Sequence, residues 1–309
     1  MTGGRVPLVA WALLALPVGF WGGGYTATSV ATDHTSGLLL AGLRTLPTLA
    51  VLPLALLLGA RLPRGADIRG AIISGLLVVT VFFIGISEAT KHAGAANAAV
   101  LISAAPLWVA LLARIFLRER ISRTAVAGLL LGFAGIVVMV SRQLGGSHGA
   151  SDLTIGIGLA LAAGIAWAAG TMIVRRMAVR NPQLDFVGLT AAQYLAGSPI
   201  LIIVAFAVKG TGGTDWGSID LWGATLWLAL GSSALATGAF FMSLRWLNAA
   251  QTSSSQFLVP VVAVIVELGR GHTPGGLVLV GMALAIAGVA LVVAGEAARS
   301  ALARRLRPV

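Results

Sequence analysis

Long apolar runs alternate with short polar breaks along the whole chain. Dividing the sequence at its charged and Gly/Pro-rich positions leaves ten apolar segments, each near the twenty or so residues that a helix needs to cross about 30 Å of hydrocarbon. The segments lie at 6–30, 36–59, 69–88, 95–114, 124–142, 153–174, 184–208, 221–243, 250–268 and 275–295. The breaks between them are too short for a soluble domain. The pattern therefore predicts an all-α, polytopic membrane protein with ten transmembrane helices.

The composition agrees with this class. Hydrophobic residues make up 58% of the 309 residues and charged residues only 10%, whereas soluble domains carry about 25% charged residues. The mean hydropathy is +0.95. Arg5 before an apolar run resembles the start of a signal peptide, but the run continues to about Val30 without a clear cleavage context. We therefore interpret it as a retained first span.

The net charge of +11 is explained by membrane topology. When both termini are placed in the cytoplasm, sixteen cations fall on the cytoplasmic side and four on the other, and Arg44 lies within a span. This bias follows the positive-inside rule, so we expect no nucleic-acid partner. Lysine occurs only at Lys91 and Lys209, and such arginine-dominated usage is typical of GC-rich bacteria. We expect a multi-pass protein of a bacterial inner (cytoplasmic) membrane with both termini cytoplasmic.

The two halves of the chain resemble each other. "ATKHAGAANAAVLISAAP" (89–106) aligns with "SLRWLNAAQTSSSQFLVP" (243–260) at a constant offset of 154. The matched pairs are Lys91 with Arg245, Asn97 with Gln251 and Pro106 with Pro260 and, after one deletion, Gly128 with Gly281 and Gly135 with Gly288. Chance similarity among Ala/Leu/Gly-rich helices is the alternative. The ordered series and the five spans in each half favour a duplication.

Because five spans is an odd number, the second half enters the membrane from the opposite face. The halves are then inverted repeats, an arrangement common in secondary carriers. We place the first five-helix repeat at 1–145, the second at 150–298, and a basic cytoplasmic tail at 299–309. The charged stretch "EATKHAG" (88–94) becomes a tight turn between spans 3 and 4, and "LRWLNAA" (244–250) is its partner on the other face.

Several motifs resemble the EamA type of the drug/metabolite transporter superfamily. They are "FWGGGY" with Trp21, "LRTLP" with Arg44, "PLWVALLARIFLRER" with Glu119, and the Gly-spaced "AGLLLGFAGIVV" that follows. The resemblance implies a central cavity lined mainly by spans 1, 3, 4, 6, 8 and 9, and amino acids, their relatives or drug-like compounds as substrates. The second half departs from the pattern, since the position matching Glu119 carries Gly271, His272 or Thr273 and no acid.

Aromatic and polar residues in the middle of spans are the candidates for substrate binding. Residues four apart share one face of a helix, as Trp21 does with Tyr25 and Trp167 with Thr171. Trp21 in span 1 also has a counterpart in Trp167 of span 6. Gln256 is the best polar candidate of "QTSSSQF", because serine hydroxyls often bond only to their own backbone. The full set is Trp21, Tyr25, Phe82, Phe83, Trp108, Trp167, Thr171, Phe240, Phe241 and Gln256. Helix packing is the alternative role for the tryptophans.

Three charged residues within or at the ends of spans are candidates for charge or proton coupling. Charges inside a membrane are costly and default to functional hypotheses, which applies to Arg44, Glu88 and Glu267. The alternatives are a structural pairing for Arg44 and solvated helix ends for the two acids. Glu119 lies among four arginines, where we expect ion pairs at the membrane interface.

The sequence offers little for enzymatic chemistry. It has no cysteine, its four histidines (34, 92, 148 and 272) are scattered in predicted outer loops, and it contains neither an H-E-x-x-H motif nor a phosphate-binding Walker loop. We expect no catalytic residue, metal site or cofactor.

The sequence therefore predicts a secondary transporter, expected to be an exporter, that moves small polar or amphipathic metabolites such as amino acids or drug-like compounds by alternating access. Its partners would be a small-molecule substrate and the lipid bilayer, with the chain as a monomer or homodimer. A lipid-linked sugar flippase and a non-transporting membrane scaffold remain the alternatives.

Overall fold

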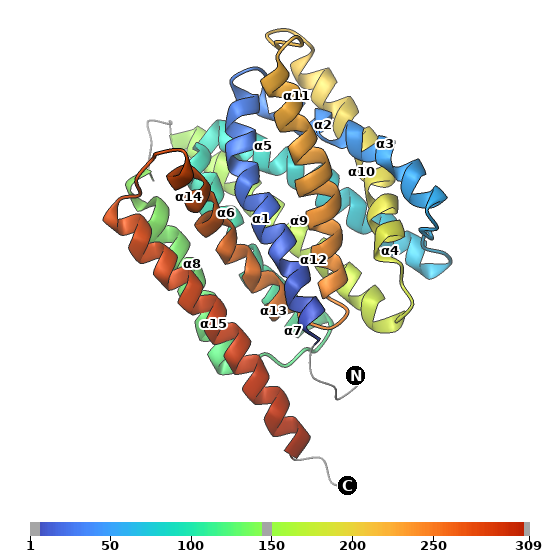
Figure 1. Cartoon of the computed structure of the whole chain (residues 1–309), viewed down its shortest axis with the longest axis vertical. Helices are drawn as coiled ribbons and strands as arrows, with labels where there is room; N and C mark the ends of the chain where they lie inside the picture. Colours follow the sequence, from blue (N-terminus) through green and yellow to red (C-terminus); the bar gives the residue numbers. More distant parts are fainter. Residues whose placement is uncertain (1–6, 144–149, 306–309) are drawn as a thin grey trace.

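A computed structural model describes residues 7–143 and 150–305, which form a bundle of helices without strands in those ranges (Figure 1). Ten helices in these ranges are long and apolar enough to cross a membrane, as the sequence predicted. Arg5, His148 and Arg307 lie outside the described residues.

The first two spans differ in continuity. Span 1 is the single helix α1 (Leu8–Thr32), while span 2 divides at Arg44 into α2 (Gly37–Leu43) and α3 (Thr45–Leu57). Pro47 has no N–H with which to bond the carbonyl of Leu43 four residues earlier, so the helical ladder is interrupted here. The break places the Arg44 side chain between helices, well inside the span.

Spans 3 and 8 share a widened, π-helical middle. Span 3 consists of α4 (Ala66–Gly75), η1 (Leu76–Val81) and α5 (Phe82–Ala93). Span 8 consists of α11 (Ile219–Leu226), η3 (Trp227–Ala236) and α12 (Thr237–Ser243). π-helical turns are rare and frequently lie at functional sites. Their occurrence at corresponding places of both halves agrees with the duplication.

Spans 4 and 9 are also interrupted at corresponding places. Span 4 consists of α6 (Ala95–Ile102) and α7 (Ala105–Phe116), and span 9 of α13 (Ala249–Ser254), η4 (Ser255–Leu258) and α14 (Val259–Gly269). Pro106 and Pro260 each lie in the first turn of the second helix, where a missing N–H costs nothing. The aligned prolines thus restart the two helices in the same way.

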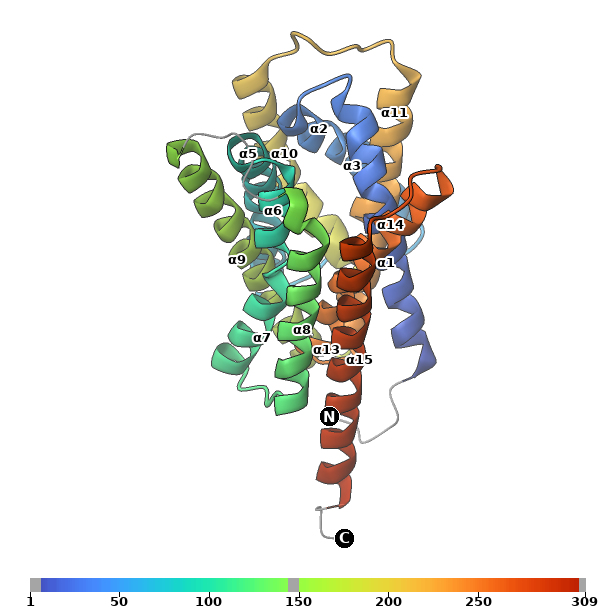
Figure 2. The same ribbon diagram turned by 90° about the vertical axis from the view of Figure 1, so that its left-hand side faces the viewer.

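The remaining spans are continuous helices. They are α8 (Arg123–Val140) with the short η2 (Ser141–Gln143), α9 (Ala150–Arg180), α10 (Phe186–Lys209) and α15 (Gly276–Arg305). The views in Figures 1 and 2 both show α8 and α15 side by side along one edge of the bundle.

The packing of α8 on α15 displays the inverted repeat directly. A Cβ on Gly128 would lie 2.6 Å from the Gly288 carbonyl oxygen, and a Cβ on Gly281 would lie 2.5 Å from that of Gly135. Gly128 corresponds to Gly281 and Gly288 to Gly135. Exchanging the two halves therefore turns the first contact into the second. A two-fold axis produces this reciprocity.

Both the start of α1 and the end of α15 lie at one end of the bundle, here called the termini end (Figure 1). The loop between α10 and α11 lies at the opposite end.

Several helices run beyond the apolar runs that predicted them. The turn after span 3 contracts to Gly94 (φ 80°), so Glu88 and His92 lie on the last turns of α5 and not in a loop. Helix α9 continues to Arg180, and α15 continues to Arg305 through most of the expected basic tail. Hydropathy marks only the hydrocarbon crossing, whereas a helix can project past it into the headgroup region.

Candidate substrate site and gate

Six of the predicted aromatic residues meet in the middle of the bundle. They come from four spans and are Trp21 on α1, Phe82 and Phe83 on α5, Trp167 on α9, and Phe240 and Phe241 on α12. Trp21 and Trp167 make an edge-to-face contact, with ring centroids 5.5 Å apart. Aromatic pairs favour this geometry. We call these six residues the aromatic cluster.

The aromatic cluster lies on the pseudo-two-fold axis. Trp21 corresponds to Trp167, so the contact between them joins equivalent residues of the two repeats. The Trp21–Phe240 centroid distance is 5.4 Å with an interplanar angle of 48°, and the Trp167–Phe82 values are 5.1 Å and 46°. Both contacts join corresponding pairs of spans, 1 with 8 and 6 with 3, although the offset of 154 sets Phe82 against Ala236. The axis of an inverted repeat lies in the plane of the membrane, which places the cluster near the bilayer centre.

The two sides of the aromatic cluster differ in exposure. Toward the termini end, it continues into buried residues of α1 and α12 and the segment after it, among them Leu14, Leu244 and Leu247. Toward the opposite end, Tyr25 shares the face of Trp21 and is 49% exposed. The cluster is thus covered by buried residues toward the termini end and adjoins an exposed tyrosine toward the opposite end.

Three nitrogen donors among the predicted residues have no acceptor in the described part of the chain. They are Nε1 of Trp108, Nε1 of Trp167 and Nε2 of Gln256. The indole of Trp108 faces Gly164, one turn before Trp167 on α9. A buried donor without an acceptor costs free energy, so these groups offer bonding capacity to a molecule that carries acceptor oxygens.

Other predicted polar groups are already satisfied. Thr171 donates to the Trp167 carbonyl at 2.8 Å. The hydroxyls of Ser253, Ser254 and Ser255 donate to backbone carbonyls three residues earlier, as expected from the sequence. These four hydroxyls donate within their own helix.

Arg44 reaches from the break in span 2 to the π-helical part of span 8. Its Nε donates to Ser233 Oγ at 3.1 Å and its Nη2 to the Leu228 carbonyl at 3.3 Å. The guanidinium also lies 4.5 Å from the ring centroid of Phe83. No carboxylate pairs with Arg44 within residues 7–143 and 150–305. Its predicted role in charge coupling stays a prediction, and its observed bonds join spans 2, 3 and 8.

Glu88 and Glu267 both lie at the opposite end. The Glu88 carboxylate is 3.5 Å from Lys91 Nζ and 3.9 Å from Lys209 Nζ. Glu267 accepts a 2.7 Å hydrogen bond from Thr26 on α1 and lies 2.9 Å from His272 Nδ1. These contacts tie helix ends together, and a part in proton coupling stays a prediction for both.

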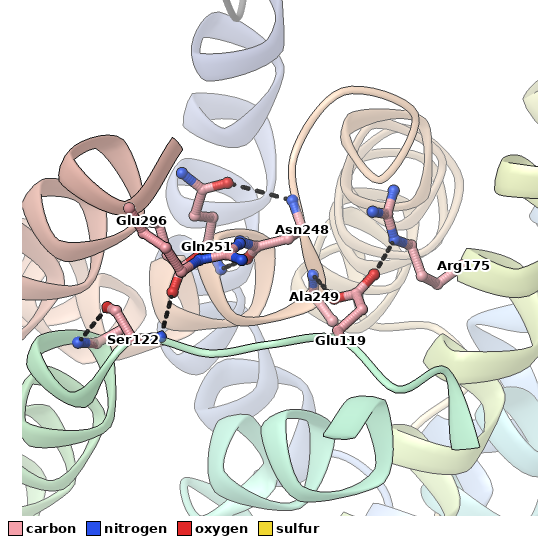
Figure 3. Close-up of polar contacts among 9 residues, drawn as sticks. Glu119, Ser122, Arg175, Asn248, Ala249, Gln251 and Glu296 are labelled. Carbon is pink, nitrogen blue, oxygen red and sulfur yellow. Dashed lines mark hydrogen bonds and ion pairs between the residues drawn. The ribbon is translucent and has the colours of Figure 1, made fainter. Parts of the chain in front are cut away.

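At the termini end, a polar network surrounds the start of α13 (Figure 3). Glu119 lies 2.8 Å from Arg175 Nε on α9, and its second oxygen accepts from the Ala249 N–H at 3.3 Å. Arg175, which is 4% exposed, also donates to the Leu244 carbonyl. The partner of Glu119 is thus a buried arginine 56 positions away, and not one of the neighbouring arginines that the sequence suggested.

A second carboxylate completes the network from α15. Glu296 is 1% exposed and accepts from the Ser122 N–H at 2.8 Å and from Asn248 Nδ2 at 2.7 Å (Figure 3). Asn248 also forms a capping box with Gln251, which satisfies the free N–H groups at the start of α13. We call Glu119, Arg175, Asn248 and Glu296 the gate network, because it fastens spans 4, 6, 9 and 10 together.

The gate network has no acidic counterpart in the other half. The offset of 154 sets Thr273 against Glu119, and the offset of 153 sets Gln143 against Glu296. The carboxylates of the gate network thus have no equivalent at the matching positions of the opposite end, where Glu88 and Glu267 join other helix ends. Sequence reasoning missed Glu296, which directly follows the apolar run of span 10 (275–295); an acid at the end of such a run is the one signal that the sequence offers for it.

Comparison with known proteins identifies similar chains. The family model described as the EamA-like transporter family matches residues 9–141 and 154–294, one stretch in each repeat. A crystal structure described only as that of a protein superposes with a TM-score of 0.78 at 23% identity, covering 97% of this chain and 99% of the other. At that identity, the likeness shows the fold alone.

Curated relatives carry transporter names. A "probable terminal-alkyne amino-acid exporter" of Streptantibioticus cattleyicolor is 28% identical over 286 residues, 92% of each chain. An uncharacterized transporter of Archaeoglobus fulgidus is 26% identical, covering 82% of this chain and 87% of its own. The uncharacterized inner membrane transporter YedA of Escherichia coli is 28% identical, covering 84% of this chain and 82% of its own.

Proposed function

Because the chain belongs to the EamA-like transporter family and is a multi-pass membrane transporter, we propose that it is a secondary exporter of small amphipathic metabolites. It works by alternating access, with the substrate held at the aromatic cluster. The aromatic cluster on the pseudo-two-fold axis is the observation that carries this proposal, because inverted-repeat carriers bind their substrate at the membrane midplane where the repeats meet.

The chemistry of the site favours an amino acid or a close relative. Aromatic rings supply apolar contact area, and the unpaired N–H groups of Trp108, Trp167 and Gln256 supply donors for carboxylate oxygens. A sugar phosphate would need several cations at the site. Among the described residues, Arg44 is the one arginine in contact with the aromatic cluster, through Phe83, and it is already bonded to Ser233 and Leu228. The amino-acid exporter name of the Streptantibioticus relative agrees with this class.

The positive-inside rule places the termini end in the cytoplasm. The membrane is then a bacterial inner membrane, in agreement with the name of the Escherichia coli relative. In this orientation the gate network closes the cytoplasmic side, and the interior is reached from outside. Export requires the gate network to open, so that repeats 1–145 and 150–298 rock about the aromatic cluster.

The flippase alternative finds less support. A groove of about 450 Å³ does lie between α1, α11 and α14, lined by small and apolar residues such as Gly23, Ala27 and Trp227. Its charged lining residue is Asp220, an acid, whereas a lipid-linked sugar phosphate would need a cation there. We therefore retain the metabolite exporter.

The test uses purified protein in liposomes loaded with a mixture of labelled amino acids. Release of particular amino acids should exceed that from protein-free liposomes, and repeating the assay with an imposed pH gradient measures proton coupling. Trp21→Ala or Gln256→Ala should reduce the rate about tenfold, since an aromatic contact or a hydrogen bond to a charged group is worth about 1.4 kcal/mol. Trp222→Ala, at the opposite end, is the matched control and should leave the rate unchanged.

Absence of release from folded protein would contradict the amino-acid class. Unchanged rates in both Trp21→Ala and Gln256→Ala, with release by the parent chain, would contradict the site and leave the transporter role standing.

A further inference from the structure

A basic hollow lies at the termini end, in the turn between spans 4 and 5. Its volume is about 380 Å³, and it is lined by Arg114, Arg118, Glu119, Arg120 and Ile121. Neither the aromatic cluster nor the proposed export requires it.

The positive charge of this hollow is not neutralised by the protein. The carboxylate oxygens of Glu119 are engaged by Arg175 and by the Ala249 N–H, both outside the hollow. Arg114, Arg118 and Arg120 are exposed and pair with no acid in the part of the chain that the structure describes. Arg123 adds a further cation at the start of α8. Three arginines therefore line the hollow, and a fourth lies near it in the sequence.

The backbone fixes the turn that carries these arginines. Arg118 has a φ of 53°, a left-handed conformation that is costly for residues with a Cβ. The N–H groups of Leu117 and Glu119 both donate to the Ala113 carbonyl at 3.1 Å, which folds the turn back over the end of α7. The gate contacts of Glu119 hold it from the other side. The hollow is thus built by the fold.

An apolar surface continues from the hollow into the membrane. On α7, Leu111 is 45%, Ile115 57% and Phe116 70% exposed. Leu111 and Ile115 are four residues apart and share one helix face, with Arg114 between them. Guanidinium groups at the membrane surface beside a lipid-facing apolar strip match the two parts of a phospholipid, its phosphate and its acyl chains.

We propose that this hollow binds the headgroup phosphate of an anionic phospholipid, such as phosphatidylglycerol, from the cytoplasmic leaflet. Basic pockets at the cytoplasmic side of membrane helices recognise such headgroups, and arginine forks match phosphate oxygens in pairs. The inference rests on the proposed orientation and not on the proposed substrate. The bound lipid holds the turn that carries Glu119, so it stabilises the closed gate network.

The experiment measures thermal unfolding of the full chain in a neutral detergent. Dioleoylphosphatidylglycerol should raise the Tm by about 5 °C over dioleoylphosphatidylcholine, the shift expected near a hundredfold excess over the Kd. In the variant that combines Arg114→Gln, Arg118→Gln and Arg120→Gln, binding should weaken about 100-fold and most of the shift should disappear. Combined Arg61→Gln, Arg64→Gln and Arg69→Gln removes the same charge at the same end of the molecule and should keep the shift.

A further variant controls for misfolding of the glutamine variants. Combined Arg114→Lys, Arg118→Lys and Arg120→Lys keeps the charge and the topology but loses the paired hydrogen bonds, so its shift should fall to roughly half of the parent value. Equal loss in both glutamine variants, or an undiminished shift in the lysine variant, would overturn the built site. Inorganic phosphate producing the same shift as the lipid would replace the lipid by a soluble anion and overturn the proposal.

Discussion

Glu296 shows how one buried carboxylate holds several groups at once. One oxygen accepts from the Ser122 N–H at 2.8 Å. The other accepts from Asn248 at 2.7 Å and from Arg299 Nη2 at 2.7 Å. Every neighbour is a donor, so the site requires a group that accepts on both sides.

We expect Glu296→Gln to lower the free energy of unfolding by about 1–3 kcal/mol, because its amide N–H₂ must face a donor and leave it unpaired. Chemical denaturation in detergent measures the change. Glu88→Gln is the matched control, since its partners lie at 3.5–3.9 Å near the surface and such pairs contribute about 0–1 kcal/mol. Equal losses in the two variants would contradict the proposed burial effect.

At the residue scale, the sequence showed which side chains belong to the candidate site better than it showed which residues they contact. Trp21, Trp167 and the two Phe pairs stand out because aromatic residues recur in the middle of matching spans, and the structure brings them together. The ion pair between Glu119 and Arg175 joins residues 56 positions apart. No local pattern indicates such a partner, since the choice depends on how spans 4 and 6 pack.

At the scale of elements, the close packing of α8 against α15 depends on glycines, which have no side chain to keep the two helices apart. A Cβ on Gly288 would lie 2.5 Å from the Gly132 nitrogen and 2.6 Å from the Gly128 carbonyl oxygen. These are backbone atoms within a helix, so relief requires the two helices to separate. Small residues permit such close approach between membrane helices.

Gly288→Ala should therefore destabilise the protein by about 1–3 kcal/mol, the usual cost of overpacking, despite the better helix propensity of alanine. Gly158→Ala on α9 is the control, because nothing lies within 4 Å of its added Cβ, and it should be neutral or stabilise by up to about 1 kcal/mol. Thermal unfolding of both variants in the same detergent measures the difference in stability. A Gly288→Ala protein as stable as the control would show that the helices can move apart freely.

The spans themselves were predictable from apolar runs, and the repeat was predictable from aligned prolines and glycines. The π-helical segments η1 and η3 were not, since their residues continue the apolar runs without a break. The carbonyls of Leu228, Ala229 and Ser232 in η3 accept from Arg44, Thr48 and Trp21. These donors come from spans 1 and 2, so the wide turn is a property of the assembled bundle.

At the scale of the whole molecule, the two ends differ in the acidic residues that hold the spans together. Acids of the gate network close the termini end, while the corresponding positions at the other end carry Thr273 and Gln143. Two nearly symmetric repeats would otherwise have two conformations of similar free energy, related by the axis. Under the proposed alternating-access export, the gate network biases the resting molecule toward the conformation that is open opposite the termini, and it sets the barrier that export must overcome.

Cysteine labelling tests this bias, because the chain has no native cysteine to interfere. In right-side-out vesicles, a membrane-impermeant maleimide should label Tyr25→Cys at least about tenfold faster than Leu14→Cys, given exposures of 49% and 5% and a minor conformation of 10% or less. Adding Glu119→Gln removes a charge-assisted bond worth about 1.5–3 kcal/mol. It should slow labelling at Tyr25→Cys and, in inverted vesicles, raise labelling at Leu14→Cys about tenfold or more. Adding Glu88→Gln should change neither rate.

If Leu14→Cys reacted as fast as Tyr25→Cys in the parent background, the termini end would not be the closed side. The gate network would then be only a structural contact between spans.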